Sequence, residues 1–145
     1  MAPLVDIRDL RIVARADNGV ETEIVKRVSF SVDKGEVVGL IGESGSGKTT
    51  IALAVLGYTR FGCRIASGSV RIGETNITEL DRKGLARIRG RRVAYIAQSA
   101  AASFNPSRSI MVQVIESALI HGTATQTEAE AKARELFRAL AIPEP

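Results

Sequence analysis

The feature that most constrains this chain is a glycine-rich loop at residues 42–49, which reads GESGSGKT. The preceding residues 37–41 are apolar apart from a glycine, a pattern typical of a strand that is covered on both faces in a parallel sheet. The following residues 49–56 have helical spacing and stop at Gly57, a residue suited to the position after a helix. The loop therefore fits the pattern G-x-x-x-x-G-K-[ST] in the strand–loop–helix context that predicts phosphate binding.

The residue types in this loop match that chemistry. Glycines allow successive backbone N–H groups to converge on phosphate oxygens at a helix N-terminus. The Lys48 ammonium can neutralise β- and γ-phosphate charge, and the Thr49 hydroxyl is placed to bind Mg²⁺. The predicted nucleotide-binding residues are Gly42, Ser44, Gly45, Ser46, Gly47, Lys48, Thr49 and Thr50. The alternative is a glycine-rich turn that happens to precede a lysine, and the flanking elements disfavour it.

Composition excludes several other classes. The 145 residues are 45% hydrophobic and 25% charged, as expected of one soluble globular domain or a piece of a larger one. No apolar run approaches the roughly 18 residues of a membrane-spanning helix, and the N-terminus lacks the layout of a signal peptide. The single cysteine, Cys63, cannot form an internal disulfide. We therefore expect a cytoplasmic location.

The order of elements is β first, then mixed. Two strand-like segments, residues 4–14 and 22–32, flank Asn18-Gly19, which suits a tight hairpin turn. In the second of them Val28, Phe30 and Val32 alternate with serines, which predicts one buried and one polar face. The further expected elements are a short edge strand at 70–72 after an irregular segment at 58–67, a buried strand at 93–97, and helices at 110–120 and about 127–141.

These motifs in this order resemble the ATP-binding subunit (nucleotide-binding domain) of ATP-binding cassette (ABC) transporters. Residues 28–36 look like the strand that leads into the family's phosphate-binding loop, and residues 42–49 match its Walker A motif. Gln98 stands where the family carries its Q-loop glutamine. Residues 103–106, Ser-Phe-Asn-Pro, are similar to a segment typical of the oligopeptide, dipeptide and nickel importer subfamily, as is the Ile142-Pro143 pair.

The resemblance implies a fold, cofactors and partners. The fold class is α/β, a P-loop NTPase core with an N-terminal antiparallel β subdomain. The cofactors are ATP and Mg²⁺, with Gln98 as a catalytic residue that shares the metal with Thr49. The partners are membrane-spanning permease subunits, a second ABC ATPase subunit or domain and, indirectly, an extracytoplasmic solute-binding protein. The expected location is peripheral, on the inner face of the cell membrane.

The chain departs from the family pattern in two respects. The family usually has an aromatic residue near the end of its first strand to stack on adenine, and Ala14 stands there. The LSGGQ signature is missing and no aspartate follows Asp81, so a Walker B aspartate, the catalytic glutamate after it and the switch histidine are also missing. We therefore expect residues 1–145 to form the N-terminal portion of a single ABC-type ATP-binding domain, an incomplete domain that does not hydrolyse ATP by itself.

Other interpretations remain open at this point. A small P-loop kinase that phosphorylates a metabolite would need Asp33 and Asp81 as substrate bases. A nucleotide-binding fragment without catalysis is another possibility. The basic segment 82–92 lacks aromatic residues to stack on bases, so we interpret it as a solvated, partly helical face and expect no nucleic acid partner. His121, followed by glycine, is interpreted as a residue at a helix C-terminus.

Overall fold

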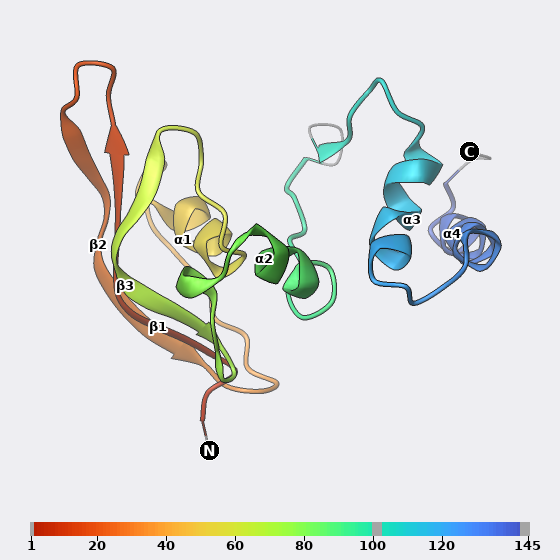
Figure 1. Cartoon of the computed structure of the whole chain (residues 1–145), viewed down its shortest axis with the longest axis horizontal. Helices are drawn as coiled ribbons and strands as arrows, with labels where there is room; N and C mark the ends of the chain where they lie inside the picture. Colours follow the sequence, from red (N-terminus) through yellow and green to blue (C-terminus); the bar gives the residue numbers. More distant parts are fainter. Residues whose placement is uncertain (1, 100–102, 143–145) are drawn as a thin grey trace. The chain divides into compact units, whose positions relative to one another are not determined.

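The computed structural model describes residues 2–99 and 103–142. The chain divides into two compact units, residues 1–89 and residues 90–145, and each is treated by itself below. Figure 1 shows the sheet with helices α1 and α2 in the first unit, and helices α3 and α4 in the second.

The first unit begins with the predicted hairpin. Strand β1 (Val5–Arg15) pairs antiparallel with β2 (Glu21–Val32). Gly19 has a φ of 82° in the connecting turn, and the Asn18 side chain accepts a hydrogen bond of 3.0 Å from the N–H of Val20. The alternation expected in β2 is also confirmed, because Val28, Phe30 and Val32 are half-buried while the intervening serines are exposed.

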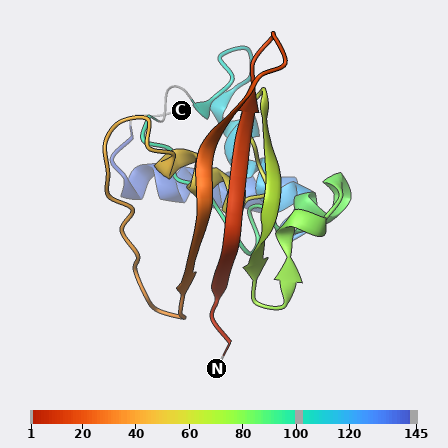
Figure 2. The same cartoon turned by 90° about the vertical axis from the view of Figure 1, so that its left-hand side faces the viewer.

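A third long strand extends the sheet. Strand β3 (Cys63–Ile72) pairs antiparallel with β1, and the two-residue β4 (Thr75–Asn76) follows it at the edge, so the strand order is β2-β1-β3-β4 (Figure 2). The expectation of a short edge strand at 70–72 was therefore wrong. The strand begins already at Cys63, because it pairs with β1, more than forty residues earlier in the chain. It lies inside the sheet, between β1 and β4.

A bulge shapes the contact between β1 and β3. Asp9 has a φ of 46°, the register shifts between Arg8 and Arg11, and the Asp9 N–H donates to the Ser29 hydroxyl at 2.8 Å. Gly68 faces this bulge with a φ of 90°. A Cβ there would lie 2.5 Å from the carbonyl oxygen of Arg8 and would also meet that of Asp9. The close approach of the two strands therefore requires glycine at position 68.

Two short helices pack on this sheet, α1 (Lys48–Val55) and the 3₁₀ helix η1 (Ile77–Glu79). A third short helix, α2 (Arg82–Ile88), follows η1 in the chain. Helix α1 ends at Leu56 and Gly57 as predicted, and the Arg89 guanidinium donates to the carbonyl oxygens of these two residues at 2.8 and 2.9 Å. The buried apolar side chains of this unit are Ile7, Leu10, Ile12, Val13, Val25, Ile51, Ala54, Val70, Ile72, Ile77 and Ile88.

Two expected strands are not formed. Residues 37–41 and 93–97 have no continuous strand ladder, and the side chains of Val37, Ile41 and Ile96 are 95%, 99% and 94% exposed. Figure 2 shows the chain between β2 and α1 as a loop beside the sheet. A strand that is apolar on both faces needs neighbouring strands for its backbone and further layers for its side chains. The four-stranded sheet of the described residues supplies neither, and its pairings are all antiparallel.

The second unit is built on two helices. Helices α3 (Ile110–Ile120) and α4 (Gln126–Ala139) agree with the expected ranges, and His121 is the C-terminal cap of α3 as predicted. Their shared core consists of Ile115, Ala129 and Ala133, with Phe137 among the partly buried side chains around it. Thr125 and Glu128 form a capping box at the start of α4, and hydrogen bonds from the Thr125 N–H and hydroxyl hold the pKa of the Glu128 carboxyl below its usual value. Within residues 2–99 and 103–142, no helix combines the length and apolar character that crossing a membrane requires.

We predict that Gly68→Ala lowers the free energy of unfolding by roughly 2 kcal/mol or more, because the new Cβ strains a left-handed backbone and clashes with two carbonyl groups. Urea unfolding followed by circular dichroism measures the change. Gly39→Ala is the matched control, since nothing lies within 4 Å of a Cβ at that position. Equal stability of the two variants would contradict the close β1–β3 contact.

Candidate functional site

The glycine-rich loop leads into α1 and packs against β2. Gly45 and Gly47 have φ values of 83° and 91°, a left-handed conformation that favours glycine. A Cβ on Gly47 would lie 2.9 Å from the carbonyl oxygen of Ile24 and 3.4 Å from a methyl group of Val25. Gly47 is also the N-cap of α1, without a side-chain cap. The start of the helix can therefore approach the backbone of β2 only because position 47 has no side chain.

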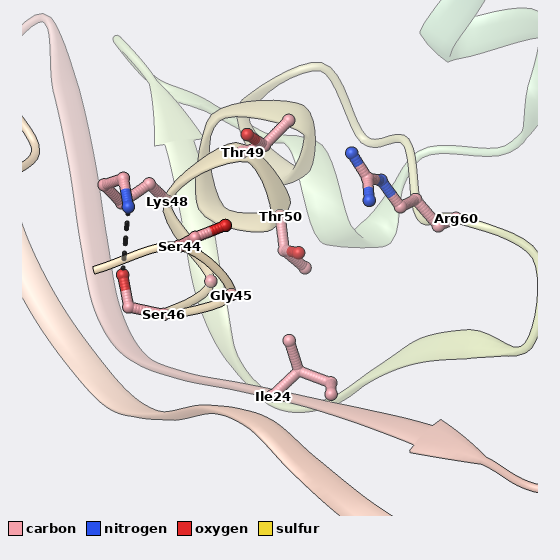
Figure 3. Close-up of a pocket in the computed structure, with 9 residues that line it drawn as sticks. Ile24, Ser44, Gly45, Ser46, Lys48, Thr49, Thr50 and Arg60 are labelled. Atoms are coloured by element: carbon pink, nitrogen blue, oxygen red, sulfur yellow. Dashed lines mark hydrogen bonds between the residues drawn. The ribbon is translucent and has the colours of Figure 1, made fainter. Parts of the chain in front are cut away.

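The Lys48 side chain folds back over the loop. Its Nζ donates to the carbonyl oxygens of Gly42 and Glu43 at 2.8 and 2.6 Å. It also donates to the Ser46 hydroxyl at 3.2 Å (Figure 3). An ammonium group has three protons, so these three acceptors use its whole donor capacity. A phosphate oxygen that binds Nζ must therefore replace at least one loop acceptor.

A pocket of about 430 Å³ lies beside the loop and the first turn of α1. Its size is within the roughly 300–1,000 Å³ typical of small-molecule sites. It is lined by Ile24, Ser44, Gly45, Ser46, Gly47, Lys48, Thr49, Thr50 and Arg60 (Figure 3). The lining thus contains two cationic side chains, hydroxyl groups and the positive end of a helix, with no carboxylate. This electrostatic environment favours an anionic ligand.

The metal-binding capacity of the pocket is partial. The exposed Thr49 side chain contributes one hydroxyl. Mg²⁺ in nucleotide sites is normally held by one or two carboxylates together with phosphate oxygens and water. Among the residues that the structure describes, no group of three or more His, Cys, Asp or Glu side chains is placed to hold a metal ion. The residues present thus fit a Mg²⁺ ion that a bound phosphate chain brings with it, with Thr49 as one ligand.

Most of the predicted site residues come together. Ser44, Gly45, Ser46, Gly47, Lys48, Thr49 and Thr50 line one pocket, and Gly42 accepts a hydrogen bond from Lys48. Gln98 is exposed at a bend in the second unit, so its pairing with Thr49 at a metal stays a prediction.

The two aspartates that a kinase would need do not line this pocket. The Asp81 carboxylate is the N-cap of α2 and accepts from the Gly84 N–H at 2.7 Å. Asp33 forms a turn with Glu36, whose carboxylate accepts from the Asp33 N–H at 2.6 Å. The pocket therefore gives the kinase interpretation no candidate base.

Two lining residues, Ile24 and Arg60, were not identified from the sequence. Neither belongs to a motif, and each lies many positions away from the loop. Only the packing of the loop on β2 places Ile24 in the pocket, and only the course of the chain between α1 and β3 places Arg60 there. No pattern in the sequence encodes either contact.

The glycine-rich loop that leads into α1 is typical of P-loop nucleotide-binding proteins. A family model described as "ABC transporter" matches residues 25–144, and the chain belongs to that family. The resemblance inferred from the sequence is thereby confirmed.

Relatives carry names from one branch of this family. The chain is 32% identical over 142 residues to the dipeptide transport ATP-binding protein DppD of Haemophilus influenzae, covering 98% of this chain and 43% of that protein. It is 34% identical over 143 residues to a probable peptide ABC transporter ATP-binding protein, y4tR, of Sinorhizobium fredii, covering 98% and 42%. It is 35% identical over 115 residues to the oligopeptide transport ATP-binding protein AppD of Bacillus subtilis, covering 79% and 35%. The chain therefore spans less than half the length of each of these relatives.

We predict that Lys48→Ala lowers the affinity for ATP by at least about tenfold, because it removes charge-assisted hydrogen bonds to phosphate and the three contacts that close the loop. Titration of the 145-residue chain with a fluorescent ATP analogue measures the loss. Lys83→Ala, an exposed lysine in the basic helix α2, is the control for a general effect of charge. Equal affinity of the wild type and Lys48→Ala would contradict the assignment of the loop.

Proposed function

We propose that the protein is the ATP-binding component of an ABC import system, which couples ATP binding and hydrolysis to the uptake of a solute. The names of the matched relatives support a dipeptide or oligopeptide as that solute. The resemblance of residues 103–106 to the peptide and nickel importer subfamily leaves nickel as the second candidate.

One observation carries the proposal: the pocket beside the loop combines Lys48, Thr49 and the start of α1 without any carboxylate. A phosphate chain carrying Mg²⁺ provides a partner for each of these groups. The N–H groups of the loop donate to phosphate oxygens, and Lys48 neutralises their charge. Thr49 and, in the proposed arrangement, Gln98 hold the Mg²⁺ that neutralises the remaining charge.

The proposed domain organisation follows from what the 145 residues contain. They supply the phosphate cradle and one metal-binding hydroxyl, but the pocket lacks an acidic group to complete the metal shell or to position water. We infer that residues 1–145 act as the N-terminal portion of an ABC-type ATP-binding domain in an α/β P-loop fold. The remaining catalytic groups then come from outside this sequence.

The proposed partners follow from the family. They are membrane-spanning permease subunits and a second ATPase subunit or domain, with a solute-binding protein on the outer side. The protein would then lie on the inner face of the membrane.

The proposal is tested in a strain from which the gene has been deleted, by measuring uptake of a labelled dipeptide, a labelled oligopeptide and nickel. The wild-type gene should restore uptake of one of them. Lys48→Ala should restore none, because nucleotide binding is lost. Gln98→Ala should keep nucleotide binding and still fail to restore uptake. Restoration by Lys48→Ala would contradict an ATP-driven role for this loop.

We further predict that the 145-residue chain binds ATP and releases no phosphate above background, since its pocket has no carboxylate to act as base. A steady-state phosphate-release assay with Mg²⁺ present measures this. Turnover that disappears in Lys48→Ala would contradict the prediction and favour the kinase alternative, above all if an added metabolite stimulated it.

A further inference from the structure

The pocket reaches past the phosphate loop to a second cation, Arg60. Figure 3 shows Lys48 and Arg60 on different sides of the first turn of α1, with Thr49 and Thr50 between them. Ile24 of β2 supplies the apolar part of the lining. The part of the pocket near Arg60 thus combines a planar cation with an aliphatic side chain, away from the Lys48 ammonium.

The backbone around Arg60 is held by the sheet. The carbonyl oxygen of Arg60 accepts from the Cys63 N–H at 2.9 Å, and that of Gly62 accepts from the Arg15 N–H at 2.8 Å. Cys63 is also the register partner of Ala14 in the β1–β3 ladder. These contacts fix the turn that carries Arg60 beside the end of β1.

The guanidinium of Arg60 is available for a ligand. Its side chain is exposed, and within the described residues it forms no hydrogen bond and no ion pair. By contrast, Arg64, four residues later, is paired with Glu21 at 2.8 Å. An arginine that lines a pocket without a protein partner can approach a ligand without first breaking an ion pair.

The position of Arg60 favours contact with the nucleoside part of a nucleotide. Phosphates that occupy the loop and reach Lys48 leave the rest of the molecule for the part of the pocket near Thr50, Ile24 and Arg60. A flat base needs a flat or apolar surface there, and none of the lining residues is aromatic. A guanidinium plane can stack on a base, and an aliphatic side chain can pack against it.

We propose that Arg60 is the base-recognition residue of this site, with its guanidinium stacked on the base of the bound nucleotide and Ile24 as the apolar contact. The inference rests on the proposed function, because it takes the ligand to be a nucleoside triphosphate. It assigns to Arg60 the base contact for which Ala14, near the end of β1, has no aromatic ring.

Calorimetric titration of the 145-residue chain with ATP and with inorganic tripolyphosphate separates base recognition from phosphate recognition. Arg60→Lys keeps the positive charge but removes the planar group. It should weaken ATP binding by about tenfold, the loss of a stacking contact worth between one and two kcal/mol, and leave tripolyphosphate binding unchanged. Arg60→Ala should weaken ATP binding at least as much. Lys48→Ala should weaken the binding of both ligands.

Phe61→Ala is the matched control. Phe61 is the fully exposed aromatic neighbour of Arg60 and does not line the pocket, so ATP affinity should stay at the wild-type value. Wild-type affinity of Arg60→Lys for ATP would overturn the stacking role, as would a loss of affinity in Phe61→Ala alone. A wild-type chain that binds neither ATP nor tripolyphosphate would overturn both this inference and the proposed function. Circular dichroism spectra that match the wild type confirm that the variants are folded.

Discussion

The site depends on the contact between Gly47 and the backbone of β2. A side chain at this position would begin 2.9 Å from the carbonyl oxygen of Ile24, so a residue with a Cβ would push the loop away from the strand. The contact fixes where α1 starts, since the Ile51 N–H donates to the Gly47 carbonyl oxygen at 2.9 Å. The start of α1 in turn fixes Lys48 above the loop. Glycine at position 47 therefore brings three groups into one pocket: the positive end of α1, the Lys48 ammonium and the Thr49 hydroxyl.

The antiparallel sheet gives this contact a rigid base. The β1–β2 hairpin holds Ile24 and Val25 in place, and β3 pairs along β1 where Gly68 faces the bulge at Asp9. The same pairing anchors the turn before β3 and so brings Arg60 to the pocket. The pocket thus combines three segments that are distant in sequence, and the sheet is the element that brings them together.

The sequence predicted the locally encoded features. Asn18-Gly19 marked the hairpin turn, the spacing of glycines and lysine marked the loop, and Thr125 with Glu128 stands at the start of a helix that was expected within one residue.

Features that depend on distant partners were missed. The length of β3 was underestimated, because residues 63–69 show no clear alternation of apolar and polar residues. Its pairing with β1 stabilises this part of the strand. Residues 37–41 were expected to form a buried strand because they are apolar. Such a strand also requires neighbouring strands on both sides, and the sheet of the described residues does not provide them. Arg60 carries no local signal, so only the structure associates it with the loop.

We infer that the loop on β2 is the phosphate site of this ABC family member. The most direct measurement is a nuclear magnetic resonance titration of the isotope-labelled chain with ATP, following the backbone amide signals. We expect the largest shifts on residues 43–50 and smaller ones at Ile24 and Arg60, because the loop N–H groups and these two side chains surround the ligand. Shifts confined to the basic residues 82–92, with the loop signals unmoved, would show binding by surface charge alone and would contradict it.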